Sequence, residues 1–163
     1  MERGQTLGDF YEQLSRPITE MRPGSYTAEL LTAGAPRIIK KCTEEMSESF
    51  QALWEQGDEQ INSEVSQTIY HLMLLMIAVG KGNMSAVEGE VERKKAEGQK
   101  LPDTLGYAVR ICGESMGEVF QTALNEASTD SEMSSRVADV FLNFQNSMTA
   151  AGKGSWAGVL EKL

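Results

Sequence analysis

Two similar segments lie in the two halves of this sequence, and this internal repeat constrains the fold more than any other feature. Residues 42–51 (CTEEMSESFQ) align with residues 112–121 (CGESMGEVFQ), which keeps the Cys, two Glu, the Met, the Phe and the Gln in register. After a two-residue offset, Gly80-Lys-Gly82 aligns with Gly152-Lys-Gly154. The alternative is a chance likeness between two helices rich in Met and Glu. Because order, spacing and the terminating Gly-Lys-Gly all match, we predict a duplicated unit.

Helical periodicity covers nearly the whole chain, and runs of β-branched residues are few. Gly, Pro, Asn and Asp mark the turns, including one at Pro102-Asp103. The predicted helices are 6–15, 25–33, 36–56, 59–79, 84–97, 104–127, 131–151 and 155–162. We therefore predict an all-α bundle of two duplicated helical hairpins, a fused pseudo-dimer with its first repeat in residues 1–97 and its second in residues 98–163.

Charge and hydropathy exclude several classes of partner. With 15 Lys and Arg against 24 Asp and Glu, the formal charge is −9, which argues against binding to nucleic-acid polymers or anionic membranes. The longest apolar stretch, Ile69–Val79, is too short to span a membrane. No basic segment followed by an apolar one opens the chain, so we expect a cytoplasmic protein, or an organellar form whose leader has been removed. Cys42 and Cys112 fit no metal or redox spacing and are predicted to be buried free thiols.

The chemical signal lies in the first repeat, on the helix predicted at 36–56. Glu44, Glu45 and Glu48 fall within about one turn of each other, so their like charges are unfavourable unless a cation is present. On the next helix, Glu64 and Gln67 are spaced i, i+3, and hairpin packing could bring them opposite. The apolar stripe of the first helix is predicted to contain Ile38, Ile39, Met46, Phe50, Leu53 and Trp54.

Oxygen ligands of this kind suit Mg²⁺ or Mn²⁺, and a Mg²⁺ site built from a few carboxylates leaves coordination positions for water and phosphates. Nucleotide polyphosphates are therefore the ligand class that the pattern indicates. The alternative is that the three neighbouring glutamates only form a solvated helix face. A further nucleotide-binding motif, a Walker loop, is absent from the sequence.

Four segments, in this order, resemble the phosphoribosyl-ATP pyrophosphatase family: Pro23-Gly-Ser-Tyr-Thr27, Lys40-Lys41, Glu44-Glu45-x-x-Glu48 and Glu64-Val-Ser-Gln-Thr-Ile-Tyr-His71. The resemblance spans about residues 6–95 and places the chain among the all-α nucleotide pyrophosphohydrolases. It implies Mg²⁺-dependent hydrolysis of the α,β-phosphoanhydride of phosphoribosyl-ATP, which yields phosphoribosyl-AMP and pyrophosphate. That reaction is the second step of histidine biosynthesis.

The resemblance also implies roles for individual residues. The metal ligands would be Glu44, Glu45, Glu48, Glu64 and Gln67. Glu45 and Glu48 would be catalytic, with Glu45 orienting the attacking water, although Gln67 stands where the family signature has Asp and brings no charge. The substrate would contact Ser25, Tyr26, Thr27, Lys40 and Lys41. Ser25 and Thr27 could instead cap a helix, and one of the two lysines could be solvated.

The second repeat keeps only part of the acidic pattern. Glu114, Glu118 and Asp139 match motif positions, whereas Ser115 and Arg136 replace two glutamates. We expect no ordinary metal site there, with Arg136 either paired to a neighbouring glutamate or in contact with phosphate. His71 is expected to pack or hydrogen-bond within its hairpin.

Two other functions remain open from the sequence. One is hydrolysis of noncanonical nucleoside triphosphates in nucleotide house-cleaning, and the other is a degenerate, non-catalytic structural or regulatory subunit. The expected partner is a nucleotide substrate, and a homodimer of the pseudo-dimeric chain is compatible with the pattern.

Overall fold

The computed structural model describes residues 6–98 and 104–163, and helices are the only regular elements in those ranges. The elements are α1 (Leu7–Leu14), η1 (Ile18–Glu20), α2 (Tyr26–Ala33), α3 (Ala35–Glu55), α4 (Asp58–Val79), α5 (Met84–Ala96), α6 (Leu105–Leu124), α7 (Asp130–Ala151) and α8 (Trp156–Lys162). The all-α prediction is confirmed. Within the same ranges, no helix combines the length and apolar character needed to cross a bilayer.

The helix ends follow the local chemistry of the sequence, which is why most predicted bounds agree closely. Gly80 and Gly152 both end long helices in the left-handed conformation. The main error is the helix predicted at 104–127, because α6 ends at Leu124. There Asn125 leaves the helical conformation and its side chain accepts a hydrogen bond from the Ala127 amide at 3.1 Å. The short η1 was not predicted, and the Pro102-Asp103 turn lies outside the described residues.

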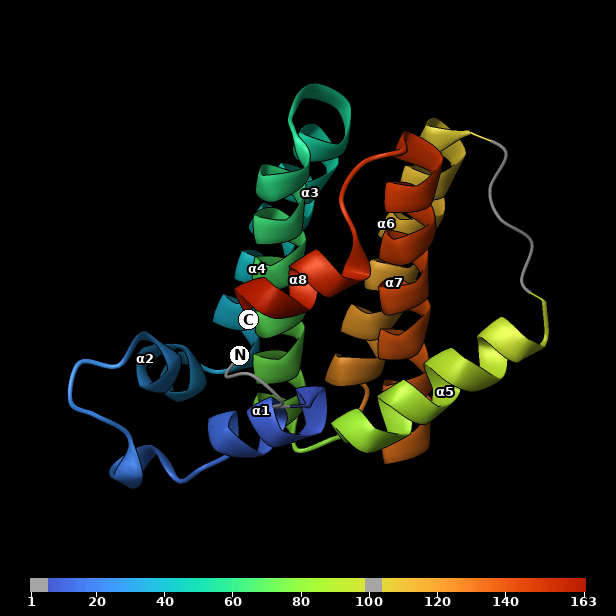
Figure 1. The fold of residues 1–163 in the computed structure, drawn as a ribbon. Helices are drawn as coiled ribbons and strands as arrows, with labels where there is room; N and C mark the ends of the chain where they lie inside the picture. Colours follow the sequence, from blue (N-terminus) through green and yellow to red (C-terminus); the bar gives the residue numbers. More distant parts are fainter. Residues whose placement is uncertain (1–5, 99–103) are drawn as a thin grey trace.

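Two helical hairpins, α3 with α4 and α6 with α7, stand side by side and form the bundle (Figure 1). Helices α3 and α4 each contact both helices of the other hairpin, so the two hairpins share one core. The ring centroids of Phe50 of α3 and Phe144 of α7 lie 6.0 Å apart, in contact between the two hairpins. The prediction for Trp54 is wrong: at the last turn of α3 this side chain is 51% exposed. Cys42 and Cys112 are buried free thiols, as predicted.

The two Gly-Lys-Gly turns dock reciprocally on the opposite hairpin. The amide of Gly82 donates to the Asp130 carboxylate at the start of α7 at 3.1 Å, and the amide of Gly154 donates to Asp58 at the start of α4 at 2.8 Å. The helices that follow also cross over, since α5 packs on α7 and α8 packs on α4. This reciprocity is the arrangement that a duplicated hairpin would produce. The duplication itself, and the division at residues 97 and 98, remain predictions.

Replacing Gly154 by Ala should lower the free energy of unfolding by about 2 kcal/mol or more. Gly154 has a φ of +70°, and an added Cβ would lie 2.9 Å from Ile61 Cγ2. Gly152→Ala is the matched control, because φ is +65° there but nothing lies within 4 Å of the new Cβ. The control should lose only about 1 kcal/mol. Urea unfolding of both variants measures the difference, and equal losses would contradict the docking of this turn on α4.

Candidate active site

Three carboxylates meet where α3 and α4 face each other. Glu45 and Glu48 come from α3 and Glu64 from α4, and one carboxylate oxygen of each lies within 4.8 Å of the others. Glu45 is only 8% exposed, whereas Glu48 is exposed and Glu64 half-buried. Burial raises the pKa of Glu64, and the negative charges of Glu48 and Glu45 raise it further. These three residues, called here the acidic cluster, therefore concentrate negative charge that a divalent cation would offset.

The donor set of the acidic cluster fits a hard divalent cation. All three side chains offer carboxylate oxygens, which Mg²⁺ and Mn²⁺ prefer. Three ligands also leave coordination positions for water or phosphate oxygens. The identity of the metal remains a prediction.

Glu44 is turned toward lysines instead of the acidic cluster. Its carboxylate lies 2.9 Å from the Lys41 ammonium and 3.3 Å from that of Lys40. Hydrogen bonds from Lys41 and then Lys40 lower the pKa of Glu44. That Glu44 ligates a metal stays a prediction, and its side chain would have to leave both lysines to do so.

Lys41 lies between Glu44 and the acidic cluster. Its ammonium also lies 3.1 Å from Glu45 Oε1, so it bridges two neighbouring carboxylates on α3. Hydrogen bonds to Glu44 and Glu45 raise the pKa of Lys41 above its ordinary value. Lys41 therefore carries a positive charge at the edge of the acidic cluster, and its contact with substrate remains a prediction.

Helix α2 is fixed against α4 by two hydrogen bonds between side chains. Tyr26 Oη lies 3.4 Å from His71 Nε2, and Thr27 Oγ1 lies 2.8 Å from Tyr70 Oη. His71 Nδ1 lies 2.8 Å from the carbonyl oxygen of Gln67. In the neutral ring, Nδ1 donates to that carbonyl and Nε2 accepts from Tyr26. His71 thus packs and hydrogen-bonds as expected, and it positions Tyr26.

Two further predicted residues lie near this contact. Ser25 caps α2, because its hydroxyl accepts from the Ala28 amide at 3.5 Å. Gln67 follows Glu64 by about one helical turn and is exposed at the wall of a cavity of about 280 Å³ that Tyr26 and Tyr70 also line. Substrate binding by Ser25 and metal ligation by Gln67 both remain predictions.

Comparison with known proteins gives the same family that the motifs indicate. A family model described as phosphoribosyl-ATP pyrophosphohydrolase matches residues 7–95, more than half of the chain. The chain belongs to this family. A phosphoribosyl-ATP pyrophosphatase of Listeria welshimeri is 34% identical over 91 residues, which are 56% of this chain and 86% of the relative.

Two further relatives carry the same printed name. The phosphoribosyl-ATP pyrophosphatase of Saccharolobus solfataricus is 39% identical over 91 residues, 56% of this chain and 96% of the relative. That of Sulfurisphaera tokodaii is 39% identical over 74 residues, 45% of this chain and 79% of the relative. No solved structure matches the chain. The family match ends at residue 95, so α6, α7 and α8 lie outside it.

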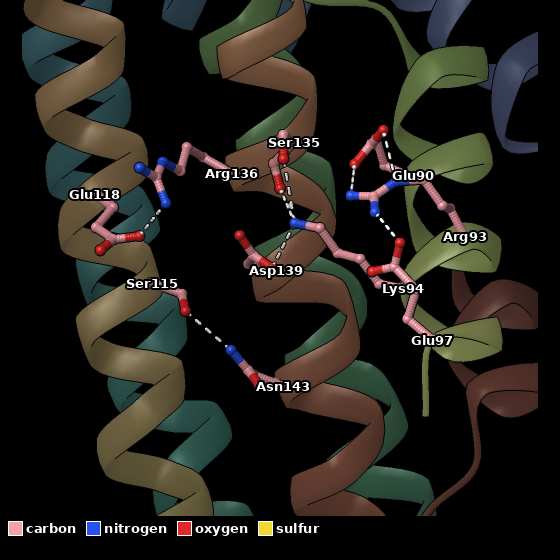
Figure 2. Close-up of polar contacts among 10 residues, drawn as sticks. All are labelled: Glu90, Arg93, Lys94, Glu97, Ser115, Glu118, Ser135, Arg136, Asp139 and Asn143. Carbon is pink, nitrogen blue, oxygen red and sulfur yellow. Dashed lines mark hydrogen bonds and ion pairs between the residues drawn. The ribbon is translucent and has the colours of Figure 1, made fainter. Parts of the chain in front are cut away.

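In the second hairpin, the position that matches Glu64 carries a positive charge. Arg136 stands there and pairs with Glu118, the counterpart of Glu48, at 2.9 Å (Figure 2). Arg136 is therefore paired to a neighbouring glutamate, one of the two alternatives predicted for it, whereas Glu114 pairs with Arg110.

A second protein cation enters the same region from α5. Lys94 donates to Asp139 at 2.6 Å, and the Asn143 amide donates to Ser115 at 2.9 Å (Figure 2). Asp139 matches Gln67 in the first hairpin, and Ser115 matches Glu45. The three carboxylates that match motif positions, Glu114, Glu118 and Asp139, are thus each paired with a cationic side chain. The absence of an ordinary metal site there remains a prediction.

The sequence reasoning missed two contacts that shape these regions. Gln60 donates a hydrogen bond to Glu64, and their i, i+4 spacing on one helix was a usable signal. The second contact is made by Lys94, in the basic last turn of α5. Its partner Asp139 lies in a distant segment, so nothing local predicted the pair.

Lowering the pH should destabilise the wild-type protein, because protonation of His71 is unfavourable in the folded state. Burial lowers the pKa of His71 below its ordinary value of 6.5. At acidic pH, His71 therefore binds a proton more readily in the unfolded chain than in the folded chain. The stability that the neutral ring provides is present above pH 6.5 and is lost as pH falls toward the folded pKa. His71→Asn should remove this loss, and Asn stands at the matching position 143. Urea unfolding at pH 7.5 and 5.5 should show the stability gap between the two proteins narrowing in acid, and an unchanged gap would contradict a buried neutral His71.

Proposed function

We propose that this protein hydrolyses phosphoribosyl-ATP to phosphoribosyl-AMP and pyrophosphate, with Mg²⁺ held by Glu45, Glu48 and Glu64. The observation that carries the proposal is the meeting of these three carboxylates within 4.8 Å, inside the part of the chain that matches the family. When bound there, Mg²⁺ would offset negative charge on the phosphate oxygens and lower the pKa of a bound water. A metal-chelated nucleotide also suits a chain of formal charge −9 better than a nucleic-acid polymer does.

The side chains in and around the acidic cluster have separate proposed roles. Lys41 holds Glu45 Oε1 at 3.1 Å and so fixes the orientation of this nearly buried carboxylate. We assign Glu45 Oε2 as the atom that accepts a proton from the attacking water. Glu48 and Glu64 complete the oxygen donors from both helices. The Lys41 ammonium can leave Glu44 and donate to a phosphate oxygen without losing Glu45.

Helix α2 is proposed to hold the nucleoside side of the substrate. Tyr26 is exposed, yet its hydroxyl is held by His71, so the ring is placed before substrate arrives. Thr27 is fixed by Tyr70 in the same way. Such preorganised contacts lower the cost of ordering side chains on binding. A cytoplasmic location is part of the same proposal.

The test is pyrophosphate release from phosphoribosyl-ATP with Mg²⁺, run beside ATP and noncanonical nucleoside triphosphates and repeated after chelation of the metal. We expect phosphoribosyl-ATP to be the preferred substrate and chelation to stop turnover. Preference for a noncanonical triphosphate would instead indicate a function in nucleotide house-cleaning. No turnover of any nucleotide would identify a non-catalytic subunit and overturn the proposal.

A further inference from the structure

The last helix of the chain lies against the helix that carries Glu64. In Figure 1, α8 crosses in front of α4, and the two helices are in contact. The amide of Ser155 donates to Asn62 Oδ1 at 2.9 Å, and Val159 is fully buried. Helix α8 is therefore anchored on α4, although it lies outside residues 7–95, which the family model matches.

This docking places α8 at the wall of the cavity next to the proposed active site. The cavity, of about 280 Å³, is lined by Phe10 of α1, Tyr26 of α2, Gln67 and Tyr70 of α4, and Lys162 at the end of α8. Among the described residues that line the cavity, Lys162 has the one cationic side chain, and no side chain is acidic. Since Gln67 is about one turn beyond Glu64, the cavity adjoins the acidic cluster.

The lining chemistry suits one part of the proposed substrate. The Tyr and Phe rings offer flat apolar surfaces, and the Gln67 amide offers a hydrogen-bond donor and acceptor. A volume of about 280 Å³ lies just below the usual range for small-ligand pockets, so it would hold a fragment of a nucleotide with its charged groups at the edges. Phosphoribosyl-ATP has two anionic ends, the triphosphate and the phosphate of the phosphoribosyl group.

We infer that Lys162 binds the phosphate of the phosphoribosyl group while the triphosphate lies at the acidic cluster, so that the second half of the chain determines substrate choice. This inference rests on the proposed function. It gives Lys162 a specificity role: the contact is available to phosphoribosyl-ATP and absent for ATP, which lacks that phosphate. The nucleobase and its attached ribose would then occupy the cavity between Tyr26 and Tyr70.

Lys162 can change partners at low cost. Within the described part of the chain, its one ion pair is with Glu59 at 3.2 Å, and the two side chains are 39% and 88% exposed. Ion pairs this exposed contribute about 0–1 kcal/mol, and salt screens them. A phosphate is a stronger partner for an ammonium than an exposed carboxylate, because it brings more charge and more acceptor oxygens.

The test compares Lys162→Met, Lys162→Arg and Glu59→Gln with the wild type. Lys162→Met should raise KM for phosphoribosyl-ATP about tenfold and leave kcat within about twofold, as expected for loss of a contact made equally in ground and transition states. Lys162→Arg should restore most of the loss. Glu59→Gln separates the two roles, because it removes the same ion pair but keeps the ammonium, so KM should stay unchanged or fall.

The affinity for the product tests the inference without a measurement of turnover. Calorimetric titration should show phosphoribosyl-AMP binding Lys162→Met about tenfold more weakly than wild type, while the affinity for AMP stays the same. An unchanged KM and product affinity in Lys162→Met, equal weakening of AMP, or the same KM rise in Glu59→Gln would each overturn the inference and leave the proposed function standing. If the wild type neither hydrolyses phosphoribosyl-ATP nor binds phosphoribosyl-AMP, both fail.

Discussion

Replacing Glu48 by Gln should lower kcat/KM for phosphoribosyl-ATP by at least about 100-fold at limiting Mg²⁺, since loss of even an outer-shell partner costs a metal site about 10–100-fold. The substitution keeps the size of the side chain and removes one of three charges that lie within 4.8 Å of one another. For the same reason the metal-free variant should unfold no more easily than wild type, because a like-charge contact is relieved. Pyrophosphate release across a Mg²⁺ series, together with urea unfolding in chelator, measures both effects.

Glu118→Gln is the matched control, because Glu118 is the counterpart of Glu48 in the second hairpin. Its partner is Arg136 at 2.9 Å, and both side chains are about half exposed. Activity should remain within about twofold of wild type, and stability should fall by less than about 1 kcal/mol. If Glu118→Gln lost as much activity as Glu48→Gln, the chemistry would not be confined to the first hairpin. If neither variant lost activity, the acidic cluster would not be the active site.

The positions of the helices could be predicted because they depend on nearby residues. Gly80 and Gly152 end α4 and α7 in left-handed conformations that glycine adopts freely, and the apolar spacing between such ends is helical. The packing of α5 and α8 on the opposite hairpins could not be predicted from nearby residues. It depends on contacts such as that between Gly154 and Asp58, whose residues lie far apart in the sequence and form no local pattern.

The acidic cluster was predictable in part for a similar reason. Helical spacing placed Glu45 and Glu48 together, and the hairpin brought Glu64 opposite them. Spacing alone could not separate Glu44 from Glu45, because both lie within one turn of Lys41 and both bind it. What separates them is α4, which covers Glu45 and leaves Glu44 beside exposed Lys40. That depends on tertiary packing, which a single sequence does not express.

A second large effect is expected in the core that the two hairpins share. Phe144→Ala should lower the free energy of unfolding by about 3–5 kcal/mol and the melting temperature by roughly 10 °C. Phe144 is fully buried in the second hairpin and contacts Phe50 of the first. Leu124→Ala is the control, since Leu124 is exposed and should change stability by less than about 0.5 kcal/mol.

The two tryptophans allow each half of the chain to be followed during that unfolding. Trp54 lies at the end of α3 and Trp156 at the start of α8, so Trp54→Phe and Trp156→Phe backgrounds each keep one fluorescent probe. Because α3 and α4 contact both α6 and α7, the two probes should report one transition, and Phe144→Ala should shift both equally. A shift of the Trp156 transition alone would mean that the first hairpin folds without the second. In that case the second half could be removed while the acidic cluster stays assembled, and its contribution would be limited to α8 and the cavity wall.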